Sequence, residues 1–547
     1  MDYSRGPKFM QDWFDRAFVD LRRQFHWSFL PPLMVYFAAG VSGLTAIVGA
    51  FFVKEYLGLS AAFLAGLGFW AGLPWALKMP LGHLVDVMWH RKSLLVYLGA
   101  ALIAASLLIM YGLVSHPSVM AEYMSPASWY VVSALLAPTG YVIQDAVADA
   151  MSVEAVPRVD ADGQPLSEAR TKLLHTTMQT FGRIALIVGL VAVASLNIFM
   201  FDGVAAMDQA GKSTIYGRVY LLALFIPVIS VSGVLLAKFL RLHQRRAFWA
   251  QGLSEAEIER LIDVRNETTQ PNFWYFGGGL AFVVMTLLIG LTSPPFAQEI
   301  VFAGSMAIVL FLMARLVREL APNRARVLIG TAIIIFVFRA VPLPGAGATW
   351  FEIDVLKFDQ QFLAVLSLLA SILALVGMVA LRPMMASRSI AYIVVILTIA
   401  AGVLSIPNIA LYYGIHEWTA PLTGGVVDAR FVAVIDTAIE SPLGQIAMIP
   451  MLAWIAKNAP NHLKATFFAV MASFTNLALS ASSLLTKYLN QIFTVTREVR
   501  DRGTGDIVTA ADYSLLGWLL ITVAVISVLA PIFTIIIVQR SALKTDE

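Results

Sequence analysis

Long apolar stretches separated by short polar segments run through most of the chain. Fourteen of them approach or exceed the roughly 20 residues that a helix needs to cross a bilayer. The predicted spans are residues 29–53, 59–81, 93–115, 128–152, 172–199, 216–240, 274–293, 299–317, 327–345, 361–382, 388–411, 428–456, 462–490 and 513–539. None shows the alternating pattern of a membrane β-barrel strand. The pattern predicts an all-α integral membrane protein of about 14 spans.

Composition narrows the class further. Of 547 residues, 59% are hydrophobic and 13% are charged, whereas soluble domains are about 25% charged. The net charge of +3 is too small to indicate a nucleic-acid partner. The absence of Cys excludes disulfides and Cys-ligated metals, and no phosphate-binding loop for ATP is present. We therefore expect no enzyme, no cofactor and no metal site.

Basic residues set the orientation. With the N-terminus inside, about 25 of the 38 Lys and Arg lie in predicted cytoplasmic segments and about 8 lie in outer segments. Cytoplasmic loops of membrane proteins carry this excess. We expect a multi-pass protein of the cell (inner or plasma) membrane, surrounded by the lipid bilayer, with both termini cytoplasmic.

Two polar segments are predicted to contain helices of their own. Residues 1–28 place large apolar side chains on one face, which predicts an amphipathic helix on the inner membrane surface; packing against cytoplasmic loops would explain the same pattern. In the loop 241–273, Ser254 and Glu257 have the spacing of a capping box. This loop is expected to join the two halves of the protein.

The fourth and twelfth predicted spans carry one pattern: two acids four residues apart, then a polar residue five positions later. These residues are Asp145, Asp149 and Glu154 in the fourth span, and Asp436, Glu440 and Gln445 in the twelfth. Acids four residues apart share one helix face. The offset of eight spans predicts an internal repeat of six-helix halves separated by two additional helices.

The predicted architecture is a two-half bundle of 12 core helices with a two-helix central insertion. Its parts are a cytoplasmic N-terminal helix (1–28), an N-terminal half (29–240), a cytoplasmic loop with two additional spans (241–326) and a C-terminal half (327–547). In bundles built from repeats, the substrate site lies at the interface of the repeats, near the membrane midplane.

Charged side chains inside a bilayer are costly and usually face the bundle interior. The acid pair Asp145 and Asp149 suits substrate binding or proton coupling, because two close carboxylates do not both ionise easily. A structural ion pair with Arg183 is the alternative. Asp436 and Glu440 have the same two interpretations, either a functional acid pair or a pair of structural charges.

Arg339 precedes Pro342 and Pro344, which predict a break in the helix directly after it. The rigid guanidinium fork suits a carboxylate on a ligand; pairing with Asp436 or Glu440 is the alternative. Acids outnumber bases in the predicted core, which favours proton coupling and also permits a cationic substrate. Arg183 is a candidate for substrate binding or proton coupling as well as a structural partner. Further candidates for these roles are Lys78, Tyr141, Glu154, His175 and Lys487.

Several stretches resemble known transporters. The run from Gly82 through Asp86 to Arg91 and Lys92 is similar to the loop motif of the major facilitator superfamily. This resemblance implies a gating role for these four residues, as a latch between the halves in one state of the transport cycle.

Four longer runs resemble the folate–biopterin transporter family within that superfamily. They are Leu73 to Ser93, Gln144 to Glu154, Phe338 to Gly345, and Asp436 to Pro450. The resemblance implies a secondary active transporter with a small-molecule substrate: folate, pterin or a related heterocyclic anion. It also implies alternating access with protons as the coupling ion.

Two other functions fit a transporter-like scaffold, because fold alone does not fix function. One is a non-transporting membrane assembly factor or chaperone that handles a pigment or a partner protein. The other is an exporter of cationic amphiphiles, which would use the spare carboxylates. Acids inside the membrane cost free energy, and a scaffold that does not transport has no need of them. The acids in both predicted halves therefore favour transport.

Overall fold

The computed structural model describes residues 25–545 apart from residues 54–56, 58, 77, 158–165, 256, 259–272, 293, 319, 381–388, 441–463 and 501–506. The predicted N-terminal amphipathic helix lies almost wholly outside the described residues. The capping box is confirmed: the backbone N–H and the hydroxyl of Ser254 both donate to Glu257 Oε2, at 2.9 and 2.6 Å.

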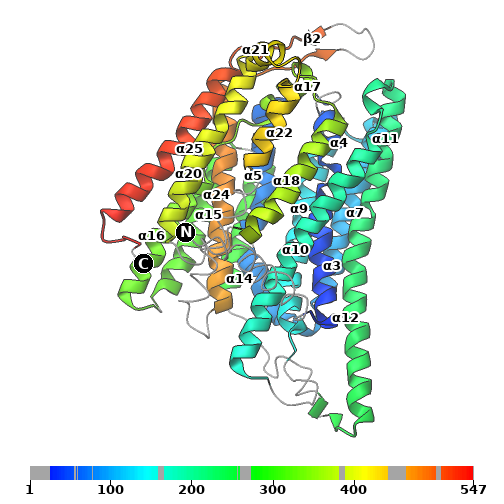
Figure 1. Cartoon of the computed structure of the whole chain (residues 1–547). Helices are drawn as coiled ribbons and strands as arrows, with labels where there is room; N and C mark the ends of the chain where they lie inside the picture. The colour runs from blue at the N-terminus through cyan, green and yellow to red at the C-terminus, as the bar shows by residue number, and fades with distance from the viewer. Residues whose placement is uncertain are drawn as a thin grey trace, which may run out of the picture.

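Helices form nearly all of the described chain (Figure 1). The N-terminal half contains α3 (Leu30–Val41), α4 (Ala46–Phe52), α5 (Ala61–Ala76), α6 (Lys78–Val87), α7 (Ser93–Ser115), α8 (Pro117–Tyr123), α9 (Pro126–Ala155), α10 (Glu168–Met200), α11 (Gln209–Ala223) and α12 (Phe225–Ala250). Helix α9 begins where Ser125 caps it, with the Ser128 N–H donating to the Ser125 hydroxyl, and Pro126 stands at its first position.

The remaining elements follow in chain order. They are α14 (Phe273–Thr292), α15 (Ala297–Val317), α16 (Pro322–Arg339), α17 (Ala346–Asp354), α18 (Gln360–Ala380), α20 (Ile390–Tyr412), α21 (Ile415–Leu422), α22 (Ala429–Glu440), α24 (Lys464–Ile492), β1 (Val499–Arg500), β2 (Ile507–Thr509) and α25 (Leu516–Gln539). The antiparallel strands β1 and β2 and helix α21 lie at the same end of the bundle as α17 (Figure 1).

Nine helices in the described part of the chain are long and apolar enough to cross a membrane. The predicted count of fourteen spans is therefore not confirmed. The range 59–81 is described as α5 and α6, with residue 77 between them outside the described residues. Helix α16 ends at Arg339 rather than continuing through residue 345. Pro342 and Pro344 explain this end, because prolines remove a backbone donor and crowd the preceding turn.

Several apolar clusters pack the helices against one another. Two clusters lie mainly among α3 to α12, and one of them also includes Ala364 of α18. A third joins α15, α16, α20, α24 and α25 and includes Ala76 of α5. The helices α14 and α15 pack on α5 and α24 through a smaller cluster that includes Phe69, Phe282 and Leu484. The hairpin α14–α15 thus contacts one helix from each predicted half.

Helices α7 and α9 approach closely at paired glycines, as small residues allow in membrane bundles. A Cβ atom on Gly140 would lie 2.6 Å from the Gly99 carbonyl oxygen. Gly140 stands five residues before Asp145 on α9, so this contact positions the acid pair.

Replacing Gly140 with Ala should separate α7 from α9, and overpacking of this kind costs about 1–3 kcal/mol of folding free energy. The unfolding temperature of the purified protein in detergent should fall. Gly277→Ala on α14 is the matched control, since a Cβ atom there has no neighbour within 4 Å. Equal unfolding temperatures for the two variants would contradict the close packing.

Candidate functional site

An ion-pair cluster lies in the N-terminal half, where α6 meets α9. Lys78, the first residue of α6, places its Nζ 2.6 Å from Asp145 Oδ2 and 2.8 Å from Asp149 Oδ2. Tyr36 on α3 donates its hydroxyl to Asp149 Oδ1 at 2.8 Å. The two acids share one face of α9, as predicted, but their ion-pair partner is Lys78 rather than Arg183. One cation between two carboxylates leaves one net negative charge.

Accessibility differs within this cluster. The side chains of Lys78 and Asp145 are 20% and 19% exposed, whereas that of Asp149 is 45% exposed. Asp149 is therefore the member of the pair that a proton from water reaches most readily.

A second ion-pair cluster lies at the end of α9. Glu154 Oε2 is 2.9 Å from Lys92 Nζ, and Glu154 Oε1 is 3.0 Å from Arg241 Nη2. Lys92 also lies over the ring of Trp89, 4.1 Å from its centroid. Of the expected gating residues, Lys92 thus pairs with Glu154, and Arg91 is exposed. Gly82 and Asp86 lie in α6, and the Asp86 side chain is outside the described residues.

The predicted break after Arg339 is present. Helix α16 ends at Arg339, Gly345 takes a positive φ of 78°, and α17 begins at Ala346. Backbone groups released by such a break need new partners inside a membrane. Helix α24 supplies three of them: Ser482 donates to the Val341 carbonyl (2.6 Å), Thr486 accepts from the Leu343 N–H (2.9 Å), and Asn490 donates to the Pro344 carbonyl (3.2 Å).

This polar face of α24 was not predicted from the sequence. Ser482, Thr486 and Asn490 are spaced by four residues, so they lie on one helix face. The spacing predicts a polar helix face, but its role becomes clear only when the broken helix is known to lie opposite that face. The three side chains hold the break in place and with it the position of Arg339.

Arg339 and Arg183 lie in different predicted halves, and their charges act on each other. Neither forms an ion pair with a described residue. Arg339 is half-buried, and its Nη1 atom is buried without a hydrogen-bond partner in the described part of the chain. Arg183 on α10 is exposed, and its charge also acts on Asp145. The predicted pairing of Arg339 with Asp436 is absent.

The C-terminal half presents its own acids. Asp436 on α22 is 5% exposed and accepts a hydrogen bond of 2.8 Å from Asn408 on α20. Glu352 on α17 is close enough for its charge to act on Asp436, and sequence reasoning missed it. The sequence feature that could have identified Glu352 is its position shortly after the predicted helix break. Glu440 is the last residue of α22, and its side chain lies outside the described residues.

The remaining candidates have other surroundings where the structure describes them. Lys487 on α24 pairs with Glu299 of α15 at 2.8 Å, so it fastens the additional hairpin to the core. Tyr141 packs at the edge of an apolar cluster. His175 lies in α10 with its side chain outside the described residues. The residues that the structure describes contain no group of His, Asp and Glu able to hold a metal ion.

Comparison with solved structures defines the class of protein. The chain resembles a POT family transporter crystallised with 5-aminolevulinic acid, with a TM-score of 0.59 and 13% identity, covering 94% of this chain and 96% of that one. It also resembles a bacterial homologue of the human drug peptide transporters PepT1 and PepT2, with a TM-score of 0.54 and 14% identity, covering 93% and 97%. The fold is that of the major facilitator type, and the chain is a multi-pass membrane protein.

Sequence comparison points in the same direction. Residues 322–547 match the BT1 family. The chain is also 23% identical over 471 residues to a folate-biopterin transporter from Synechocystis sp. strain PCC 6803, covering 85% of this chain and 75% of that protein. Both matches agree with the resemblance seen in the motifs of the chain.

Replacing Lys78 with Met should leave Asp145 and Asp149 facing each other without their cation. Breaking a buried ion pair on one side costs about 3–5 kcal/mol, so the unfolding temperature should fall clearly. Adding Asp145→Asn to Lys78→Met removes one of the two opposed charges and should recover part of the loss. Additive losses in this double-mutant cycle would contradict the pairing.

Proposed function

We propose that this protein is a proton-coupled secondary transporter that carries folate- or pterin-like heterocyclic anions by alternating access. The observation that carries the proposal is the pair Arg183 and Arg339, which lie in different predicted halves. Their charges act on each other, and neither forms an ion pair with a carboxylate in the described part of the chain. Two such cations repel each other, and an anion placed between them removes the repulsion.

The guanidinium groups of Arg183 and Arg339 favour a carboxylate as their ligand. An arginine fork binds a planar carboxylate with two parallel hydrogen bonds, and such charge-assisted bonds are stronger than neutral ones. The glutamyl carboxylates of a folate fit this requirement. The buried Nη1 of Arg339 has no hydrogen-bond partner in the described part of the chain, so it is available to donate to such a ligand. The folate-biopterin transporter to which the chain is similar supports the same substrate class.

The ring of a pterin carries hydrogen-bond donors that a carboxylate accepts. Asp145 interacts with the charge of Arg183, and in the proposed site it accepts hydrogen bonds from such a ring. Asp436 and Glu440 are the corresponding acids of the other half. The proposed site thus joins the two arginines with acids from both predicted repeats.

Proton coupling follows from the charges around Lys78. Lys78 holds Asp145 and Asp149 together, and a proton on Asp149 would cancel the excess negative charge and loosen that ion pair. Arg183 would then be freer to bind the substrate carboxylate. Proton and substrate would therefore favour each other's binding, which is the linkage that a symporter needs.

We place the protein in the cell membrane with both termini in the cytoplasm, as the distribution of Lys and Arg indicates. The halves would rock about the arginine pair during transport. The cluster of Glu154, Lys92 and Arg241 lies on the side of the cytoplasmic loop and would act as part of the inner gate together with Asp86 and Arg91.

Uptake of labelled folate into proteoliposomes tests this function. A proton gradient should drive uptake by the unchanged protein, and Arg339→Gln should lower uptake at least about ten-fold, because it removes a charge-assisted hydrogen bond worth about 1.5–3 kcal/mol. Asp145→Asn should abolish the dependence on the gradient. The matched control is Arg245→Gln, which changes an exposed ion pair with Glu255.

Each variant should retain its folded state, judged by size-exclusion chromatography and helical circular dichroism. Unchanged uptake in both Arg339→Gln and Asp145→Asn would rule out the proposed site. Uptake that is independent of the gradient in the unchanged protein would rule out proton coupling.

A further inference from the structure

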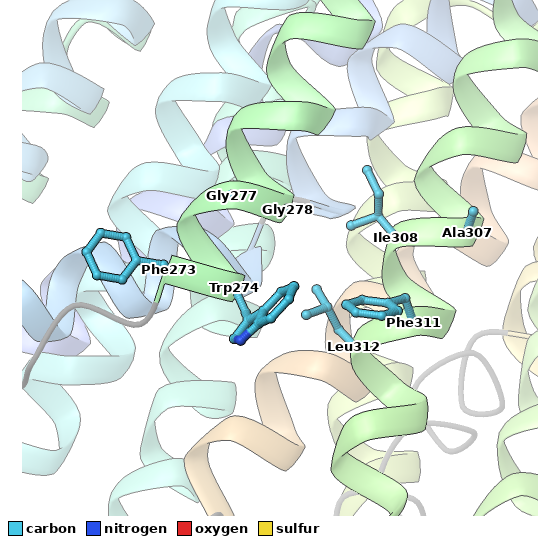
Figure 2. Close-up of a pocket in the computed structure, with 8 residues that line it drawn as sticks. All are labelled: Phe273, Trp274, Gly277, Gly278, Ala307, Ile308, Phe311 and Leu312. Atoms are coloured by element: carbon cyan, nitrogen blue, oxygen red, sulfur yellow. The ribbon is translucent and has the colours of Figure 1, made fainter.

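A second concave surface lies away from the arginine pair, on the additional hairpin. Helices α14 and α15 enclose a groove of ≈ 550 Å³, within the size range of ligand pockets. Figure 2 shows Trp274, Leu312 and Phe311 converging between the two helices, while Phe273 points away from α15. Its lining is apolar, with glycines on the α14 side. The groove therefore suits a hydrocarbon chain.

Basic residues stand at one end of this groove. Arg315 lies one turn after Phe311 on α15, with its guanidinium 3.9 Å from the centre of the Trp274 ring and 5.1 Å from that of Phe311. Arg318 follows directly after α15, and Arg324 and Arg326 lie in the first turns of α16; all three are exposed. None of these four arginines forms an ion pair with a residue that the structure describes. Among the described residues, this end of the groove therefore carries positive charge without a paired acid.

The position of these arginines at the predicted membrane surface indicates which class of ligand the groove binds. Helix α14 begins directly after the loop predicted to be cytoplasmic, and α15 ends at the next such loop. The arginines thus stand at the predicted inner surface, where anionic phospholipids attract basic residues and contribute about 1 kcal/mol for each Lys or Arg near the surface.

We propose that the α14–α15 groove is a binding site for one anionic phospholipid of the inner leaflet. One acyl chain lies between Trp274 and Ile308, and the phosphate contacts Arg315, with Arg318 beside it. Zwitterionic lipid would fill the groove less well, because its headgroup carries no net charge to balance the arginines. The hairpin also pairs with α24 through Glu299 and Lys487, so an occupied groove would brace the contact between hairpin and core.

Native mass spectrometry of the whole protein tests this site, with phosphatidylglycerol and phosphatidylcholine added in equal amounts. The unchanged protein should retain one molecule of phosphatidylglycerol under activation that removes phosphatidylcholine. Arg315→Gln should weaken this retention about five-fold, the factor that about 1 kcal/mol gives. Gly277→Leu should abolish it sterically, because a side chain at this position enters open space in the groove.

The matched control is Arg540→Gln, which removes an exposed arginine after α25, at the same predicted membrane face. It should leave retention unchanged. An equal loss in Arg540→Gln and Arg315→Gln would show general attraction of anionic lipid and overturn the site. Equal retention of the two lipids by the unchanged protein would also overturn it. Folate uptake enters none of these readouts, so the result is independent of the proposed transport function.

Discussion

The arrangement of this protein depends on the cost of placing charge inside an apolar bundle. A charge at membrane depth costs several kcal/mol unless it is paired, hydrated or bound to a ligand. Lys78 meets this requirement for Asp145 and Asp149 by lying within 2.8 Å of both. Arg183 and Arg339 form no such ion pair with a described residue, and this difference is the basis for proposing that they bind a ligand.

The broken helix gives Arg339 its position. A continuous helix would carry Arg339 within a regular turn, whereas here α16 ends at this residue. Breaking a helix inside a membrane is tolerated only where other groups satisfy the backbone. Ser482, Thr486 and Asn490 of α24 do so. Helix α24 also packs against α5 of the other half, where Asn476 donates to the Trp75 carbonyl at 3.1 Å. One helix therefore links the break, the interface and the arginine.

Much of the architecture could be predicted from the sequence because hydrophobic length and helical spacing are local properties. The apolar runs located the helices, the prolines located the break after Arg339, and the spacing of Asp145 and Asp149 placed both on one face of α9. The predicted count of fourteen spans stays unconfirmed, because nine helices in the described part of the chain are long and apolar enough to cross a membrane. The predicted repeat and its boundaries stay predictions.

Ion pairs between helices far apart in the sequence could not be predicted from the sequence. Lys78 and Asp145 are far apart in the sequence, so no periodicity relates them, and the predicted partner Arg183 was a neighbour by span order alone. Glu154 was predicted as a core acid, but it pairs with Lys92 and Arg241 near the end of α9. Lys487 was a site candidate because it is a lysine within a span, and only the position of α15 reveals its partner Glu299.

The central claim is that the arginine pair binds the carboxylates of the substrate, and equilibrium binding by titration calorimetry tests it most directly. Folate would be compared with its neutral diamide, which keeps the ring and the size but lacks both charges. The account predicts that folate binds at least about ten-fold more tightly than the diamide, since a charge-assisted hydrogen bond contributes about 1.5–3 kcal/mol. Equal affinities for the two compounds would contradict it.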